Sequence, residues 1–170
     1  MHTTLFRRAG TLALAAALFT GTAVQAADPS ALEARQQDLD VLYQSLERYH
    51  PDLFANTPEA DFLALKAEIE GRLAAESQVD FVLDLQRLAA LAGDSHTQVS
   101  LNAVADQVRF YPVVLTWYDG HWYLTTAEEG QAELLGQEVT AINGHSMEEV
   151  LAAFSTLLSA DNPVKLRRQY

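Results

Sequence analysis

Residues 88–101, LAALAGDSHTQVSL, mark the point at which the pattern of this sequence changes from helical to extended. Before Gly93, leucines and alanines recur at the three- and four-residue spacing of an amphipathic helix. After it, Thr97, Val99 and Leu101 alternate with polar residues, a period of two that predicts a strand. We therefore expect an α+β fold, with a helical part over residues 27–96 and a β-rich part over residues 97–170.

The helical part is expected to be an antiparallel layer of three helices joined by short connections. Pro51 disfavours helical geometry at His50, so the first helix should end near Tyr49. The predicted helix starts are hydroxyl residues with a partner typical of a cap, namely Ser30 with Glu33, Thr57 with Pro58, and Ser77 with Asp80. The apolar stripes of the second and third helices are Phe62, Leu65, Ile69 and Leu73, and Phe81, Leu85, Leu88 and Ala92. Gly93 stands where a left-handed C-terminal cap is favoured.

The clearest strand signal is the hairpin FYPVVLTWYDGHWYLTTA, residues 110–127. Asp119-Gly120 is a two-residue turn that favours the primed geometry of antiparallel hairpins. This turn places Trp117 opposite Trp122, and a cross-strand tryptophan pair buries a large apolar area. We expect these aromatic side chains to be part of the core rather than a platform for a ligand.

The residues after the hairpin predict one further strand and a helix packed on the sheet. The strand covers residues 137–142 and is followed by a tight turn at Asn143-Gly144. Ser146 with Glu149 opens the helix, whose apolar stripe is Val150, Phe154 and Leu157. A last helix is expected to start at Asn162-Pro163, and because the sequence barely enters it we expect the chain to be truncated before a further, catalytic domain.

Residues 1–26 have the features of a secretory signal peptide. Arg7 and Arg8 form a basic start, residues 12–19 are an apolar stretch too short to span a bilayer, and Val24-Gln25-Ala26 suits signal peptidase. We expect cleavage after Ala26, export to the periplasm or the cell exterior, and no membrane attachment of the mature chain.

The composition excludes several classes of function. The formal net charge of −12 opposes binding to nucleic acid or to anionic lipid. Without cysteine, the chain has no disulfide, thiolate nucleophile or cysteine-bound zinc. His50, His96, His121 and His145 are not at metal-ligand spacing, and the sequence contains no glycine-rich phosphate loop or Gly-x-Ser-x-Gly elbow. We expect neither a metal nor another cofactor.

The candidate chemistry lies in Asp94-Ser95-His96-Thr97. Histidine readily accepts a proton near neutral pH, and a junction between a helix and a strand would let His96 project toward another part of the molecule. The alternative is purely structural: Asp94 and Ser95 would bond backbone amides of the turn, and His96 would be a partly buried spacer.

Four segments together resemble the N-terminal part of the tail-specific (C-terminal-processing) serine peptidases, especially the tricorn-core-like branch. YHPDLF at residues 49–54 is similar to that family's segment after its first helix, and LAGDSHTQV at residues 91–99 to its Gly-Asp-x-His-Thr signature. YPVVLTWYDGHWYLTTA at residues 111–127 and LLGQEVTAINGHSMEEVL at residues 134–151 look like the following sheet, and the latter resembles a PDZ-like module.

The resemblance implies that His96 is the general base of amide hydrolysis through an acyl-enzyme and that Ser95 assists it. It places the nucleophilic serine, its acidic partner and the oxyanion loop in a later segment, so this chain alone is expected to be inactive. Leu135 and Gly136 would belong to the loop that receives the carboxylate of a peptide substrate. Two functions stay open: part of an exported serine peptidase, or a non-catalytic exported module that binds peptides. In the first case, an uncovered apolar face would favour self-association of the isolated chain.

Overall fold

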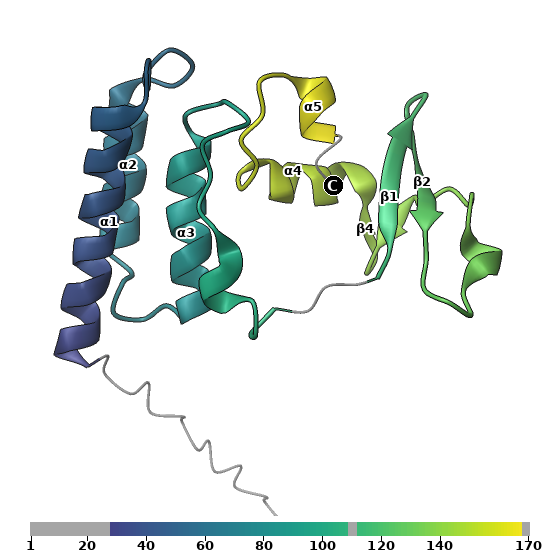
Figure 1. Ribbon diagram of the computed structural model, residues 1–170, viewed down its shortest axis with the longest axis horizontal. Coiled ribbons are helices and arrows are strands. Elements are labelled where there is room, and N and C mark those ends of the chain that lie inside the picture. The colour runs from purple at the N-terminus through teal and green to yellow at the C-terminus, as the bar shows by residue number, and fades with distance from the viewer. Residues whose placement is uncertain (1–27, 109–111, 168–170) are drawn as a thin grey trace, which may run out of the picture.

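The computed structural model describes residues 28–108 and 112–167 and shows an α+β protein (Figure 1). The predicted signal peptide, residues 1–26, lies outside the described residues. The N-terminal elements are α1 (Pro29–Tyr49), α2 (Glu59–Glu70), α3 (Gln78–Ala90) and the 3-10 helix η1 (Leu101–Val104). The elements that follow are β1 (Val114–Tyr118), β2 (His121–Thr126), the 3-10 helix η2 (Ala132–Leu134), β3 (Ala141–Ile142), β4 (His145–Ser146), α4 (Met147–Ser155) and α5 (Pro163–Arg167).

Helices α1, α2 and α3 enclose the main hydrophobic core, as their apolar spacing predicts. Phe62 and Ile69 of α2 are fully buried against Leu39 of α1 and Leu88 of α3. Burial of each such side chain contributes about 2 kcal/mol relative to an exposed one. Phe54, in the loop after α1, meets the edge of Phe62 at a centroid distance of 5.6 Å. This contact fixes the loop that carries His50 against the helical layer.

The helix starts agree with the predictions to within a residue or two. The capping box of Ser77 and Asp80 at α3 is confirmed. The predicted box of Ser30 and Glu33 is wrong, because Pro29 already occupies the first turn of α1 and Asp28 caps it by accepting from the Ser30 amide at 3.0 Å. Helix α2 begins at Glu59, since Pro58 has an extended ψ of 145° and is the cap residue rather than the first helical one.

Buried polar side chains join the end of α2 to α3. Asp84 of α3 is 1% exposed, and its two carboxylate oxygens accept from Arg72 Nε and Arg87 Nη1, each at 2.6 Å. Burial would raise the pKa of Asp84, but the bonds from these guanidinium groups outweigh it and lower the pKa. The carboxylate therefore stays ionised inside the layer.

The strand predicted for Thr97, Val99 and Leu101 is wrong. Residues 97–100 belong to no strand of the described residues, and Leu101 begins η1. The cause is Gln86 of α3, whose Oε1 accepts from the Val99 amide at 2.6 Å while its Nε2 donates to the Leu157 carbonyl at 2.6 Å. The side chain of Gln86 thus takes the place of the strand carbonyl that would otherwise have accepted from the Val99 amide.

The β1–β2 hairpin confirms its predicted register. Trp117 pairs with Trp122 and Leu115 with Leu124. Of the aromatic side chains expected in the core, Trp122 is buried, but Trp117 is half-buried and Tyr118 is 72% exposed. Asp119 and Gly120 have φ values of 49° and 87°, the positive angles that the primed turn requires.

The strand predicted at residues 137–142 forms only in part. Glu138 bridges Tyr123, and the Val139 amide donates to the Trp122 carbonyl at 2.8 Å, so the segment starts as a third antiparallel strand. It then leaves β2, and β3 pairs with β4 around the Asn143-Gly144 turn. The described residues therefore contain two small antiparallel sheets, and they do not establish a PDZ-like module.

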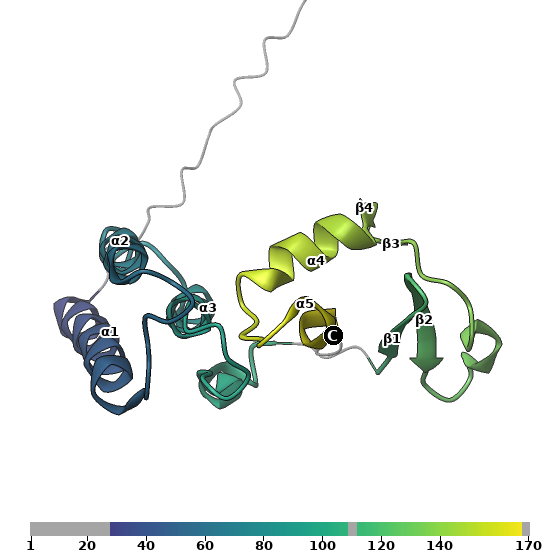
Figure 2. The ribbon, with the colours of Figure 1, turned by 90° about the horizontal axis from the view of Figure 1, so that it is seen from above.

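Helix α4 has the predicted cap but not the predicted buried face. Ser146 and Glu149 form the capping box. The predicted stripe is wrong in placing Phe154 on the sheet, because Phe154 is 49% exposed and Met147, in the first turn, is the buried residue of this helix. Figure 2 shows the reason: α4 and α5 lie between the helical layer and the hairpin, and α4 meets β3 and β4 at its N-terminal end. Helix α5 starts as predicted, with Asn162 Oδ1 accepting from the Lys165 amide at 2.9 Å.

Candidate functional site

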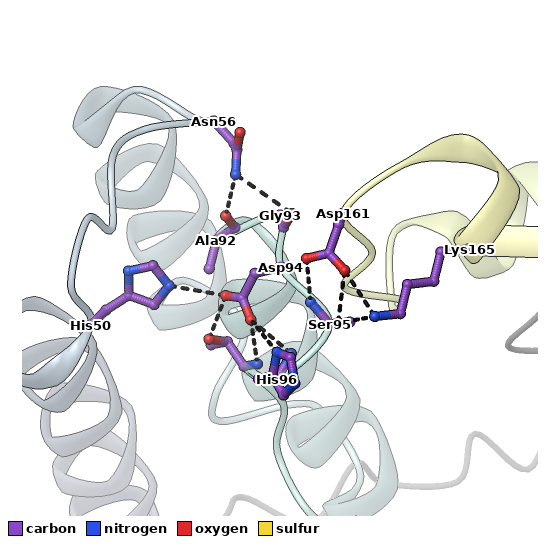
Figure 3. A network of polar contacts seen from close by, with 10 residues as sticks. His50, Asn56, Ala92, Gly93, Asp94, Ser95, His96, Asp161 and Lys165 are labelled. Atoms are coloured by element: carbon purple, nitrogen blue, oxygen red, sulfur yellow. Dashed lines mark hydrogen bonds and ion pairs between the residues drawn. The ribbon is translucent and has the colours of Figure 1, made fainter.

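The turn that follows α3, residues 93–97, is organised by the carboxylate of Asp94 (Figure 3). Asp94 Oδ1 accepts from the backbone amides of His96 at 2.7 Å and Thr97 at 3.0 Å. Asp94 Oδ2 accepts from the Thr97 hydroxyl at 2.7 Å and lies 2.9 Å from His50 Nε2. Both oxygens are therefore engaged, and the backbone on either side of His96 is held in one conformation.

These contacts keep Asp94 ionised. Partial burial would raise its pKa, but the hydrogen bonds from Thr97, from His50 and from the two backbone amides hold the pKa well below its usual range. A permanently charged carboxylate is thus placed inside the turn, where it orders the backbone rather than titrating.

His50 is the partner of Asp94 from the loop after α1. Its side chain is 16% exposed, and its Nδ1 accepts from the Asp52 amide at 3.2 Å. Because Nδ1 is an acceptor, the ring hydrogen is on Nε2, which donates to Asp94. The segments YHPDLF and LAGDSHTQV, which lie far apart in the sequence, therefore meet through this hydrogen bond.

The imidazole of His96 lies at the exposed edge of this network. It is 91% exposed, and its Nδ1 is 3.9 Å from Asp94 Oδ1, beyond hydrogen-bond distance but within the range of a loose ion pair. The purely structural interpretation is right that Asp94 bonds the backbone of the turn, but wrong in making His96 a partly buried spacer. The turn holds the backbone of His96 and leaves both ring nitrogens accessible.

Ser95 faces the opposite way and contacts the segment before α5. Its amide donates to Asp161 Oδ1 at 3.2 Å and its hydroxyl to Asp161 Oδ2 at 2.8 Å. The ammonium of Lys165 also contacts the Ser95 hydroxyl and lies 2.8 Å from Asp161 Oδ2. The hydrogen bonds of Ser95 therefore run to the C-terminal segment, whereas the structural interpretation expected them to run to amides of the turn. The lysine and serine bonds lower the pKa of Asp161 to about 2.

The start of the turn is tied to the loop after α1 a second time. Asn56 Nδ2 donates to the Ala92 carbonyl at 3.0 Å. Gly93 has the positive φ of 70° expected for a left-handed cap, and a Cβ at this position would lie 3.0 Å from atoms of Asn56. Glycine is required here both by the backbone angle and by the close approach.

Leu135 and Gly136, predicted to receive a peptide carboxylate, lie in a loop whose amides are already bonded. The Leu135 amide donates to the Ala132 carbonyl at 3.2 Å, and the Gly136 amide donates to the Leu124 carbonyl at 2.8 Å. The carboxylate cradle proposed for this loop needs free amides, and these two are used by η2 and β2. The structure does not bring this loop together with Ser95 and His96 in any contact of the described residues.

Four partners of the turn were not identified from the sequence: His50, Asn56, Asp161 and Lys165. His50 carried a signal, since it stands beside a proline in a segment already singled out. Asn56, Asp161 and Lys165 are ordinary loop and helix residues, and nothing in their local spacing indicates contacts that span 36 to 70 positions.

Comparisons of the chain with protein-family models, with curated proteins and with solved structures give no match. In residues 28–108 and 112–167, no three or more histidine or acidic side chains gather in a way that could hold a metal ion. The same residues include no helix with the length and apolarity needed to cross a bilayer.

Proposed function

We propose that this chain is part of an exported serine peptidase and supplies its general base, His96. The single observation that carries the proposal is the combination of a fixed backbone and a 91% exposed imidazole at His96. A general base needs a defined position and a ring nitrogen free to meet the reacting group. The neighbouring polar side chains of Ser95 and Asp94 are not free in this way, because both make hydrogen bonds within the protein.

In this role His96 would take the proton from a serine hydroxyl as that oxygen attacks the substrate carbonyl. It would then give the proton to the leaving amine, and water would hydrolyse the acyl-enzyme by the same base. The nucleophile would lie outside the described residues and approach the exposed side of the turn.

Ser95 is not suited to be the nucleophile. Its hydroxyl donates to Asp161 and contacts the Lys165 ammonium. The same Asp161 oxygen that accepts from the Ser95 hydroxyl also lies 2.8 Å from the Lys165 ammonium, so the hydroxyl is held within an internal network and is not directed at a substrate. Ser95 is instead a positioning residue that links the turn to the segment before α5, which gives the assisting role implied by the resemblance a physical form.

The test is peptide hydrolysis by the protein as its source cell makes and exports it. His96→Ala should lower kcat/KM by about 10²- to 10⁴-fold, as expected for loss of a general base. His145→Ala is the matched control, because His145 is also an exposed histidine but lies on β4. Equal activity of the His96→Ala and His145→Ala proteins would refute the proposal. So would an exported protein that does not react with a serine-directed fluorophosphonate.

A non-catalytic, PDZ-like peptide-binding module is the second candidate, favoured by an apolar groove of about 520 Å³ beside the hairpin. Val113, Leu115 and Leu124 line it on one side, and Val139 and Ile142 on the other. The bonded amides of Leu135 and Gly136 imply that a peptide would dock through apolar side chains rather than through its carboxylate. Binding of C-terminal peptides by a protein that hydrolyses none of them would favour this function. Self-association of the chain would indicate that the groove is covered by protein in its native setting.

A further inference from the structure

A second cavity, of about 340 Å³, lies between the β1–β2 hairpin and the start of α4. It shares no lining residue with the turn at residues 93–97, and no part of the proposed peptidase role uses it. Its chemistry differs from that of the apolar groove, because its walls combine two tryptophans with charged side chains.

The aromatic wall consists of Trp117 and Trp122, which the hairpin register places directly opposite each other. Trp122 is 6% exposed and so forms a rigid base, whereas Trp117 is half-buried and presents part of its ring. These are the two tryptophans of the whole chain. The face of an indole ring carries partial negative charge and attracts cations.

Two carboxylates complete the cavity wall. Glu138 comes from the segment bridged to β2 and lies 2.7 Å from His121 Nδ1, and Glu148 comes from the first turn of α4. Neither carboxylate is within ion-pair distance of an arginine or lysine of the described residues. Acidic groups beside an aromatic face form a setting that favours a positive ligand.

A guanidinium already lies on this aromatic wall. The central carbon of the Arg167 guanidinium is 5.1 Å from the centre of the Trp117 ring, and Arg167 lines the cavity from α5. Within the described residues, no carboxylate lies within 4 Å of Arg167 nitrogens, so this side chain rests on an aromatic ring rather than on an acid. The contact shows that the Trp117 face accepts a planar cation.

We propose that this cavity binds the guanidinium side chain of an arginine in a peptide ligand, stacked on Trp117, and that Arg167 is an internal competitor for the same face. The ligand's charge would be balanced by Glu148 and Glu138, and the acidic character of the whole chain would favour the approach of a cation. An anionic ligand would have Arg167 as its partner but would face both carboxylates. The proposal does not depend on peptidase activity, because it concerns binding to this chain without turnover.

The test is a titration of the exported protein with N-acetyl-arginine amide, in which binding is measured by tryptophan fluorescence and by calorimetry. Because both tryptophans line the cavity, a ligand bound there should change the emission, and the variants described below assign the change to this cavity. N-acetyl-citrulline amide, a neutral molecule of nearly the same shape, is the matched ligand and should bind at least about tenfold more weakly, the equivalent of one lost cation–π contact.

Variants separate the roles of the residues. Arg167→Gln should tighten binding at least about threefold by removing the competitor. The apparent affinity of a ligand is its intrinsic affinity multiplied by the fraction of molecules in which the site is unoccupied. Glu148→Gln should weaken binding, and Trp117→Leu should abolish it by calorimetry, with Trp117→Phe restoring part of the affinity. Arg48→Gln is the matched control, because Arg48 stacks on Tyr49 at 5.4 Å outside the cavity.

Three outcomes would overturn the proposal. Equal binding of the arginine and citrulline amides would show that charge is not recognised. Weaker binding after Arg167→Gln would make Arg167 part of the binding site and not a competitor. Absence of saturable binding in both the unmodified protein and the Arg167→Gln variant would show that the cavity takes no such ligand.

Discussion

The Nε2 atom of His50 lies 2.9 Å from Oδ2 of Asp94, and this contact joins the loop after α1 to the turn after α3. The two residues are 44 positions apart in the sequence. The same carboxylate holds the amides on both sides of His96, so the backbone position of His96 depends on a carboxylate that a histidine from another element also contacts. The position of His96 is thus set by packing of the helical layer, not by the turn sequence alone.

Asp94→Asn should loosen this turn. An amide keeps one acceptor oxygen but turns an NH₂ group toward donors, so at least one bond from His50 or Thr97 is lost. We expect the free energy of unfolding to fall by about 2 kcal/mol and amide exchange at His96 and Thr97 to accelerate, measured by urea denaturation and NMR. Asp106→Asn, at an exposed aspartate, should change stability by less than about 0.5 kcal/mol. Similar losses in both variants would contradict the role given to Asp94.

Alanine substitution should destabilise the protein at His50 but have little effect on stability at His96. His50→Ala removes a donor to a partly buried carboxylate and should cost about 1–2 kcal/mol in thermal or urea denaturation. His96→Ala removes an exposed ring without a hydrogen bond in the described structure and should change stability by less than about 0.5 kcal/mol. A large destabilisation by His96→Ala would mean that its ring has a structural role, and the proposed general base would lose its main support.

Local sequence patterns predicted the elements whose partners lie nearby in the chain. The Asp119-Gly120 turn determines the hairpin register because both flanking strands are built outward from it. The capping boxes at Ser77 and Ser146 were likewise predicted because donor and acceptor are three residues apart.

Features that depend on distant partners were not predictable in the same way. Alternation at residues 97–101 indicated a strand, but whether a strand forms depends on what bonds its amides, and Gln86 does so from α3. The apolar residues of α4 do recur at helical spacing, but this spacing alone does not reveal whether another element covers Phe154. The Ser95–Asp161–Lys165 contacts arise only when α5 packs near the turn. The sequence of the turn therefore indicated the candidate base, His96, but not the distant residues that contact the turn.

Gly93→Ala should destabilise the protein more than Gly120→Ala does. Both glycines have positive φ, 70° and 87°, so both alanine variants incur the backbone cost of about 1–2 kcal/mol. At Gly93 the added methyl would also lie 3.0 Å from Asn56, whereas nothing lies within 4 Å at Gly120. Urea denaturation should therefore show about 1 kcal/mol more destabilisation for Gly93→Ala. If the two variants lose the same free energy, the close approach of Asn56 does not constrain the turn.

Glu76 should make the protein less stable as the pH rises. Its side chain is 5% exposed, and neither carboxylate oxygen accepts a hydrogen bond within the described part of the chain. Burial, with the nearby Asp84 carboxylate, raises the pKa of Glu76 to about 7. Between the ordinary glutamate pKa of about 4.5 and this value, the folded state holds a proton that the unfolded state has released, so stability falls through that interval.

Glu76→Gln should remove this loss, because an amide presents no charge to desolvate at any pH. The variant should be about 2 kcal/mol more stable than the unmodified protein at pH 8 and close to it at pH 4, measured by urea denaturation across that range. Glu128→Gln, in the exposed loop after β2, should leave the pH profile unchanged. A gain that is the same at pH 4 and pH 8 would point to better packing of the amide instead of relief of a buried charge, because only the latter depends on ionisation of Glu76.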